Sequence, residues 1–250
     1  MTAAAGAPKL IVAADAAALA QTAAERVMAR IAANPGRIAI CLTGGSSPKK
    51  LYQLLGSDAW RDKIPWHRVH WFIGDERFVP SSDPLNNMAI ARAIFLDRSA
   101  PSGHIHPIPT TTEDPARSAE AYARELQAFY GSENLDPARP LFDLVLMGAG
   151  PDGHTASLFP GYPEIEETDR WVVGVPRANV APFVPRVSLT LPALASCREM
   201  LFEIAGHDKQ PILTRLLNGE TLPALRARSN GETVWLVDQA ALPEEIRGPR

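Results

Sequence analysis

The stretch that most constrains the fold of this 250-residue chain runs from Phe142 to Gly161. It begins with a short apolar run, Phe142 to Met147, which breaks into the glycine-rich turn GAGPDG. Short runs rich in Leu and Val and bounded by turn residues are typical of strands in a parallel sheet with both faces covered. Ligands of such sheets bind just beyond the carboxyl ends of the strands, so we expect the next polar residues, Asp152 and His154, to lie at a binding site.

Other short apolar runs alternate with segments that favour helices, and this alternation predicts an α/β fold with a mostly parallel sheet. The predicted strands are Lys9 to Ala13, Ile38 to Leu42, Val69 to Ile73, Trp171 to Val175, Val187 to Leu191, Glu199 to Ala205 and Thr233 to Val237. The predicted helices are Ala16 to Ala33, Lys49 to Leu55, Asp83 to about Phe95, Pro115 to Tyr130, and one from about Lys209 to Asn218. The sequence contains no repeat or obvious linker, so we expect a single domain over residues 1–250.

The composition argues against several classes of protein. The 25 Lys and Arg against 28 Asp and Glu give a net charge of -3, which supplies no positive field for nucleic acid or an anionic membrane. Cys41 and Cys197 are far apart and lack CxxC spacing, which argues against a disulfide or a zinc site and favours a reducing cytoplasm. Neither a membrane-spanning apolar run nor a basic start typical of a secretory signal is evident, so we expect a cytoplasmic protein.

A glycine-serine turn, Thr43-Gly44-Gly45-Ser46-Ser47-Pro48, joins the strand ending at Leu42 to the helix beginning at Lys49. A turn of this kind presents unpaired backbone N–H groups at the start of a helix and can bind an anion such as phosphate. The alternative is a tight turn that only needs flexible residues, and the sequence leaves both open. The turn lacks the GxxxxGK[ST] pattern of the Walker loop, which argues against a P-loop nucleotidase.

A charged segment, Asp75-Glu76-Arg77, follows the strand Val69 to Ile73. Such runs are usually solvated surface turns. Here, however, two successive strands would end in polar clusters on the same edge of the sheet, which favours a binding site.

Five further residues could bear on the site. His104 and His106 lie in a proline-rich segment without cysteine or carboxylate at ligand spacing, so we interpret them as loop or core histidines and expect no metal site. Lys209 would occupy the first turn of a helix, where a cation is unfavourable unless an anion joins it, and is therefore a candidate phosphate ligand. Arg186, in the segment PRANVAPFVPR, would face the site, as would Arg177.

The turn GAGPDG matches the GxGxxG pattern of dinucleotide sites, but its context argues against that function. Asp152 would place a negative charge where the pyrophosphate binds, and Pro160-Gly161 follows too soon for a crossover helix. A histidine two residues after an aspartate suits general acid–base chemistry, since the carboxylate can orient the ring and stabilise its charged form. The alternative is a structural His154 beside a capping Asp152, and the residues alone leave both open.

Taken in order, LTGGSSPKKLY (Leu42 to Tyr52), GDERFVP (Gly74 to Pro80), GAGPDGHTASLFPG (Gly148 to Gly161) and RVSLTLPAL (Arg186 to Leu194) closely resemble the 6-phosphogluconolactonase family. The resemblance covers almost the whole chain. It implies a Rossmann-like three-layer α/β sandwich similar to the sugar-phosphate isomerase and deaminase superfamily. It also implies hydrolysis of 6-phosphoglucono-δ-lactone to 6-phosphogluconate in the pentose phosphate pathway, without a metal or another cofactor.

The resemblance also implies roles for individual residues. His154 looks like the general base that activates water, with Asp152 as its neighbour, and the resulting imidazolium would protonate the departing ring oxygen. Arg77 would bind substrate or stabilise the oxyanion, and Asp75 belongs to the same catalytic group. The residues expected to hold the 6-phosphate are Gly44, Gly45, Ser46, Arg186 and Lys209. Arg177 stands where the family usually carries a lysine, so its role is open.

Two alternatives remain. The chain is also similar to glucosamine-6-phosphate deaminases, but these carry a glutamate where Phe159 stands and favour tyrosine where Arg77 stands. Both departures favour the lactonase. A sugar-phosphate-binding protein without activity is the other alternative, and the presence of Asp75, Arg77, Asp152 and His154 together argues against it. We expect a monomer whose partner is a small sugar-phosphate lactone, with no nucleic acid or membrane partner.

Overall fold

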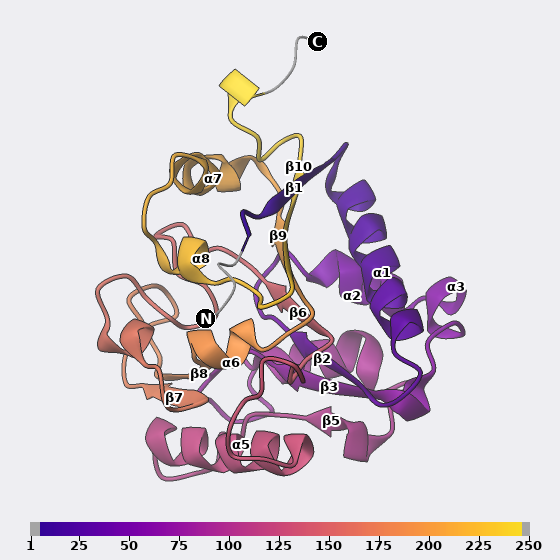
Figure 1. Cartoon of the computed structure of the whole chain (residues 1–250), viewed down its shortest axis with the longest axis vertical. Coiled ribbons are helices and arrows are strands. Elements are labelled where there is room, and N and C mark those ends of the chain that lie inside the picture. The colour runs from indigo at the N-terminus through magenta and orange to yellow at the C-terminus, as the bar shows by residue number, and fades with distance from the viewer. Residues whose placement is uncertain (1–5, 247–250) are drawn as a thin grey trace.

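The computed structural model describes residues 6–246, and its centre is a sheet of seven strands in the order β1-β10-β9-β6-β2-β3-β5 (Figure 1). Every neighbouring pair in this sheet is parallel. Its strands are β1 (Lys9–Ala13), β2 (Ile38–Leu42), β3 (Val69–Ile73), β5 (Ile105–His106), β6 (Leu144–Met147), β9 (Glu199–Ile204) and β10 (Glu232–Asp238). All residues of β2, β6 and β9 are buried, which explains the continuous apolar sequences of β2 and β6, whereas β9 also buries Glu199 and Glu203.

Helices cover both faces of the sheet and complete the predicted three-layer α/β sandwich. In Figure 1, α1 and α2 lie on one side of the sheet, and α6, α7 and α8 lie on the other. The helices are α1 (Ala16–Ala33), α2 (Lys49–Gly56), α3 (Asp58–Arg61), α4 (Asn87–Ala91), α5 (Pro115–Tyr130), α6 (Leu191–Ala195), α7 (Gln210–Leu217) and α8 (Pro223–Arg226). A π-helical turn (Arg92–Leu96) continues α4, and 3₁₀ turns cover Trp66–Arg68, Ser102–His104, Pro163–Glu166, His207–Lys209 and Glu244–Ile246.

A second, antiparallel sheet of three strands lies beside the carboxyl edge of the main sheet. Its order is β4 (Asp75–Arg77), β8 (Arg186–Leu189), β7 (Val172–Val175), and α5 packs against β7 and β8. Gly74 joins the two sheets, because its N–H donates to Leu42 O at 2.9 Å and its carbonyl accepts from Leu189 N at 2.8 Å. The small sheet thereby holds Arg77 directly opposite Arg186 in register.

The sequence predicted most elements, with differences that have local causes. Asp75–Arg77 was expected as a charged segment at the binding edge of the sheet, and not as a strand, but it forms β4 by pairing with β8. The two-residue strand β5 was not predicted. The helix expected from Asp83 begins at Asn87 instead, because the Asn86 side chain caps it by accepting from Ala89 N at 2.8 Å. Lys209 ends a 3₁₀ turn just before α7 rather than lying in its first turn.

The histidines of the HxH segment pack in an aromatic stack. His106 stacks on Phe72 with ring centroids 4.2 Å apart, and His104 stacks on His70 at 4.0 Å. His106 Nε2 also lies 2.9 Å from His70 Nδ1. Both predicted histidines therefore have structural contacts. Within residues 6–246, no helix is long and apolar enough to cross a membrane.

Candidate active site

The candidate site lies where the strand order of the main sheet changes sides, next to β2. From β2 the chain adds β3 and then β5 on one side, whereas β6, which comes later, pairs with the other side of β2. The loops after β2 and β6 therefore diverge at their carboxyl ends and leave a crevice, the usual ligand site of such sheets. A pocket of about 430 Å³ opens there, lined by residues 43–47 after β2 and 148–151 after β6, with Asp75, Arg77, Asn87, His154, Ala156, Ser157, Phe159, Val180, Ala181, Arg186 and Lys209.

His154 presents one ring nitrogen to this pocket. Its Nδ1 lies 2.5 Å from Asp152 Oδ1, and its backbone N–H donates to the same oxygen at 3.1 Å. Because a carboxylate can only accept, Nδ1 carries a proton, and in the neutral form of the ring Nε2 therefore has a free lone pair. Burial raises the pKa of Asp152, but the hydrogen bond and charge of His154 outweigh it, and the Asp152 pKa lies below its ordinary value.

Two neighbours restrict the His154 ring. A Cβ atom on Gly150 would lie only 2.0 Å from the ring, so this position of the turn has room only for glycine. On another side, the buried Phe159 ring packs against the imidazole with centroids 4.9 Å apart. Gly150 of the GAGPDG turn therefore allows the His154 ring to pack closely against the backbone.

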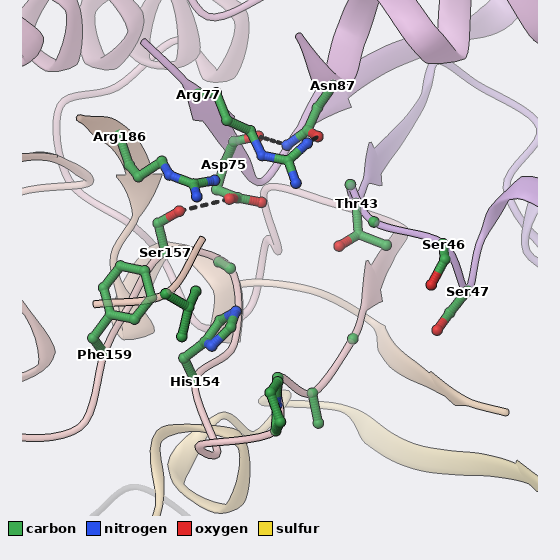
Figure 2. A pocket seen from close by; sticks show the side chains of 18 of the residues that line it. Thr43, Ser46, Ser47, Asp75, Arg77, Asn87, His154, Ser157, Phe159 and Arg186 are labelled. Carbon is green, nitrogen blue, oxygen red and sulfur yellow. Dashed lines mark hydrogen bonds between the residues drawn. The ribbon is translucent and has the colours of Figure 1, made fainter. Parts of the chain in front are cut away.

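Arg77 and Arg186 lie near each other, across the pocket from His154 (Figure 2). Arg186 is 4% exposed and donates to the carbonyls of Pro182 at 2.8 Å and Val184 at 3.3 Å. Burial lowers its pKa, which the attraction of Asp75 opposes. Arg77 Nη1 donates to Leu85 O at 3.1 Å and to the Asn87 side chain. Neutral acceptors therefore orient both guanidinium groups, and their charge is not cancelled by an ion pair.

Glu76 and Asn87 form the support of Arg77. The carboxylate of Glu76 accepts from the backbone N–H groups of Arg77 at 2.8 Å, Asn87 at 2.7 Å and Met88 at 2.9 Å. Burial raises the Glu76 pKa to about 7, which these hydrogen bonds oppose. Asn87 Nδ2 donates to Asp75 O at 3.0 Å, so α4 is tied to β4 on both sides of Arg77.

The glycine-serine turn and Lys209 complete the pocket. A Cβ on Gly44 would lie 2.2 Å from Asn87 Oδ1, so only glycine lets this turn approach the Arg77 support. No side chain caps the start of α2, and the Lys49 N–H makes only a long contact of 3.4 Å with Ser46 O. Lys209 Nζ donates to Ala149 O at 2.9 Å, which draws this cation toward the loop after β6.

The structure brings most of the predicted site residues together. The pocket is lined by His154, Arg77, Asp75, Gly44, Gly45, Ser46, Arg186 and Lys209, while Asp152 contacts His154 without lining it. Arg177 was expected to face the site, but it is exposed and is not among the lining residues. Asn87 and Ser157 were missed, because their contacts with Arg77 and Asp75 depend on segments distant in sequence.

Comparison with known proteins shows the family of the chain. The family described as "Glucosamine-6-phosphate isomerases/6-phosphogluconolactonase" matches residues 14–235. The chain belongs to this family. A 6-phosphogluconolactonase of Streptomyces coelicolor is 38% identical over 257 residues, which cover 97% of each chain. One from Synechocystis sp. is 39% identical over 215 residues, covering 84% of this chain and 85% of the relative.

A solved structure shows the same architecture. The 6-phosphogluconolactonase from Trypanosoma cruzi superposes with a TM-score of 0.82 at 28% identity, covering 94% of this chain and 96% of the other. The family resemblance inferred from the four motifs is therefore confirmed, as are the enzyme class and the α/β fold.

Proposed function

We propose that this family member hydrolyses 6-phosphoglucono-δ-lactone to 6-phosphogluconate, with His154 as the general base that activates water. The observation that carries the proposal is the position of the His154 Nε2 lone pair, on a ring fixed by Asp152 and opposite two arginines oriented by neutral acceptors. Hydrolysis of a phosphorylated lactone needs both a base for water and positive charge for anionic groups.

In the proposed reaction, His154 Nε2 removes a proton from water as its oxygen attacks the lactone carbonyl carbon. The carbonyl electrons move onto oxygen, and Arg77 stabilises the resulting oxyanion. The intermediate collapses by breaking the bond to the ring oxygen, which takes the proton from the His154 imidazolium. Asp152 stabilises that imidazolium, and its lowered pKa keeps the carboxylate ionised for this purpose. The product is an open-chain acid, and His154 returns to its neutral form.

The 6-phosphate is assigned to the donors of the pocket other than Arg77. Gly44, Gly45 and Ser46 would offer backbone N–H groups before α2, and Arg186 and Lys209 would supply charge. The cations in the pocket outnumber its one carboxylate, Asp75, which favours an anionic substrate.

The proposal is tested by generating the lactone fresh and following acid release, with ammonia release from glucosamine 6-phosphate measured in parallel. We expect acid without ammonia, since the buried Phe159 occupies the position of the deaminase glutamate. Ammonia release alone would refute the proposal. His154→Ala is expected to lower kcat by about 10²- to 10⁴-fold, the usual contribution of a general base. Full activity in a folded His154→Ala protein would remove the role of this residue.

The proposed biological setting is the pentose phosphate pathway in the cytoplasm, with the chain acting as a monomer that forms one domain. Cell fractionation and sedimentation of the purified chain test the location and the oligomeric state, respectively.

A further inference from the structure

Ser157 connects the turn that carries His154 to the strand that carries Arg77. Its hydroxyl donates to Asp75 Oδ2 at 2.6 Å, and its backbone N–H donates to Ser188 Oγ at 3.1 Å. Ser157 is 1% exposed and Asp75 is 7% exposed, so water does not compete freely for this contact. A buried hydrogen bond to a charged group is among the stronger ones in proteins.

The backbone around Ser157 is held in an unfavourable conformation. Ala156 has a φ of 48°, and it is the one non-glycine residue with positive φ among residues 6–246. Such a conformation costs free energy and persists only when the surroundings impose it. Here Thr155 Oγ1 donates to Gly148 O at 2.7 Å on one side, and the Ser157 contacts hold the other side. The strained turn therefore directs Ser157 at Asp75.

Asp75 is close to both arginines, yet it forms no ion pair with either. It exerts the largest electrostatic effect of any charged residue on Arg186, and it occupies the same three-residue strand as Arg77. None of the ion pairs within residues 6–246 includes Asp75. One of its side-chain oxygens is bound by Ser157 instead. A carboxylate in this position would ordinarily pair with a neighbouring guanidinium.

We propose that Ser157 is a positioning residue that holds Asp75 out of ion-pair contact with Arg77 and Arg186, and so keeps both guanidinium groups available to an anion. Without the Ser157 hydroxyl, rotation of the Asp75 side chain brings its carboxylate onto an arginine. In this collapsed form of the site, the Asp75 carboxylate competes with the ligand for the arginine. If about nine-tenths of the molecules collapse, the apparent affinity for an anion falls about tenfold.

The test measures the affinity of the full chain for inorganic phosphate by titration calorimetry. The variants are Ser157→Ala, Asp75→Asn and the two combined, with Ser157→Cys as a second variant of similar volume and weaker donor strength. Ser118→Ala is the matched control, since it removes another buried hydroxyl, one that donates to the Pro109 carbonyl and does not line the pocket. Thermal unfolding of each variant checks that it folds.

We expect Ser157→Ala to weaken phosphate binding about tenfold, Ser157→Cys to weaken it less, and Ser118→Ala to leave it near the wild-type value. Removing the Asp75 charge should abolish the defect, so the double variant should bind phosphate as tightly as Asp75→Asn. Unchanged affinity in Ser157→Ala, or an equal loss in the Asp75→Asn background, would overturn the inference. So would a wild-type chain that does not bind phosphate.

The inference rests on the proposed function for its choice of phosphate, but the two fail separately. A chain that binds phosphate as described but does not hydrolyse the lactone contradicts the proposed function alone. An active lactonase whose Ser157→Ala variant retains the wild-type phosphate affinity contradicts the role of Ser157 alone.

Discussion

Replacement of the buried Glu203 by glutamine is expected to remove a pH-dependent loss of stability. Glu203 lies in β9, opposite Leu236 of β10, and is 1% exposed. Neither of its carboxyl oxygens has a hydrogen-bond partner among the described residues. An isolated buried carboxylate is costly, so the folded protein favours the protonated form. Burial accordingly raises the pKa of Glu203 to about 8 from an ordinary value of 4.5.

The size of the effect follows from this shift. Each unit of pKa difference between the folded and unfolded states corresponds to about 1.4 kcal/mol. Below pH 4.5 both states are protonated at Glu203, and folding carries no penalty from ionisation. Between pH 4.5 and about 8 only the unfolded state loses the proton, so the free energy of unfolding falls as the pH rises. The loss reaches about 3 kcal/mol at pH 7 and about 5 kcal/mol above pH 8.

The assay is reversible urea unfolding of the wild type and Glu203→Gln at pH 5.5, 6.5 and 7.5. Glutamine keeps the shape but cannot ionise, so the stability difference should change in its favour by about 3 kcal/mol across this range. Glu199→Gln is the matched control, since Glu199 is equally buried in β9 but pairs with Arg26 and Arg30. That substitution should destabilise the protein at pH 7. Parallel pH profiles for the wild type and Glu203→Gln would refute the reasoning.

Two further predictions concern the site. Asp152→Asn should lower kcat for lactone hydrolysis by at least about tenfold while KM changes less, because the amide can donate to Nδ1 and leave the proton on Nε2. A steady-state kinetic comparison with the wild type measures both constants, and a rise in KM alone would contradict this role. Gly44→Ala should displace Asn87 and lower activity by disturbing Arg77. Gly103→Ala is the control, because a Cβ at that position meets only open space. Equal activity of the two variants would show that the close approach of Gly44 to Asn87 is unimportant.

The sequence was sufficient for most of the main sheet, because its inner strands are buried and read as short apolar runs, whereas the two-residue edge strand β5 was not predicted. The first strand in the chain that the sequence did not predict is β4, whose three charged residues resemble a surface turn. It is a strand because Asp75–Arg77 pairs with Arg186–Ser188, a contact more than a hundred residues away in the chain. Local sequence carries no signal for such pairing.

The candidate site likewise contains residues that the sequence predicted and residues that it did not. His154 and Asp152 were predictable because they are two residues apart at the end of a recognisable strand. Asn87 and Ser157 were not, since an asparagine at the start of a helix and a serine in a turn usually make only local hydrogen bonds. Their functions depend on the side chains that the fold places against them, Arg77 and Asp75.

The adjacency of β2 and β6 has a consequence for the order in which the protein loses activity and structure. These two strands lie inside the sheet, while β1 and β5 form its edges. Edge strands open first during partial unfolding, since each is paired on one side only. Hydrogen exchange in β1 should therefore proceed in molecules whose pocket is still assembled, and loss of ligand binding should coincide with separation of β2 from β6.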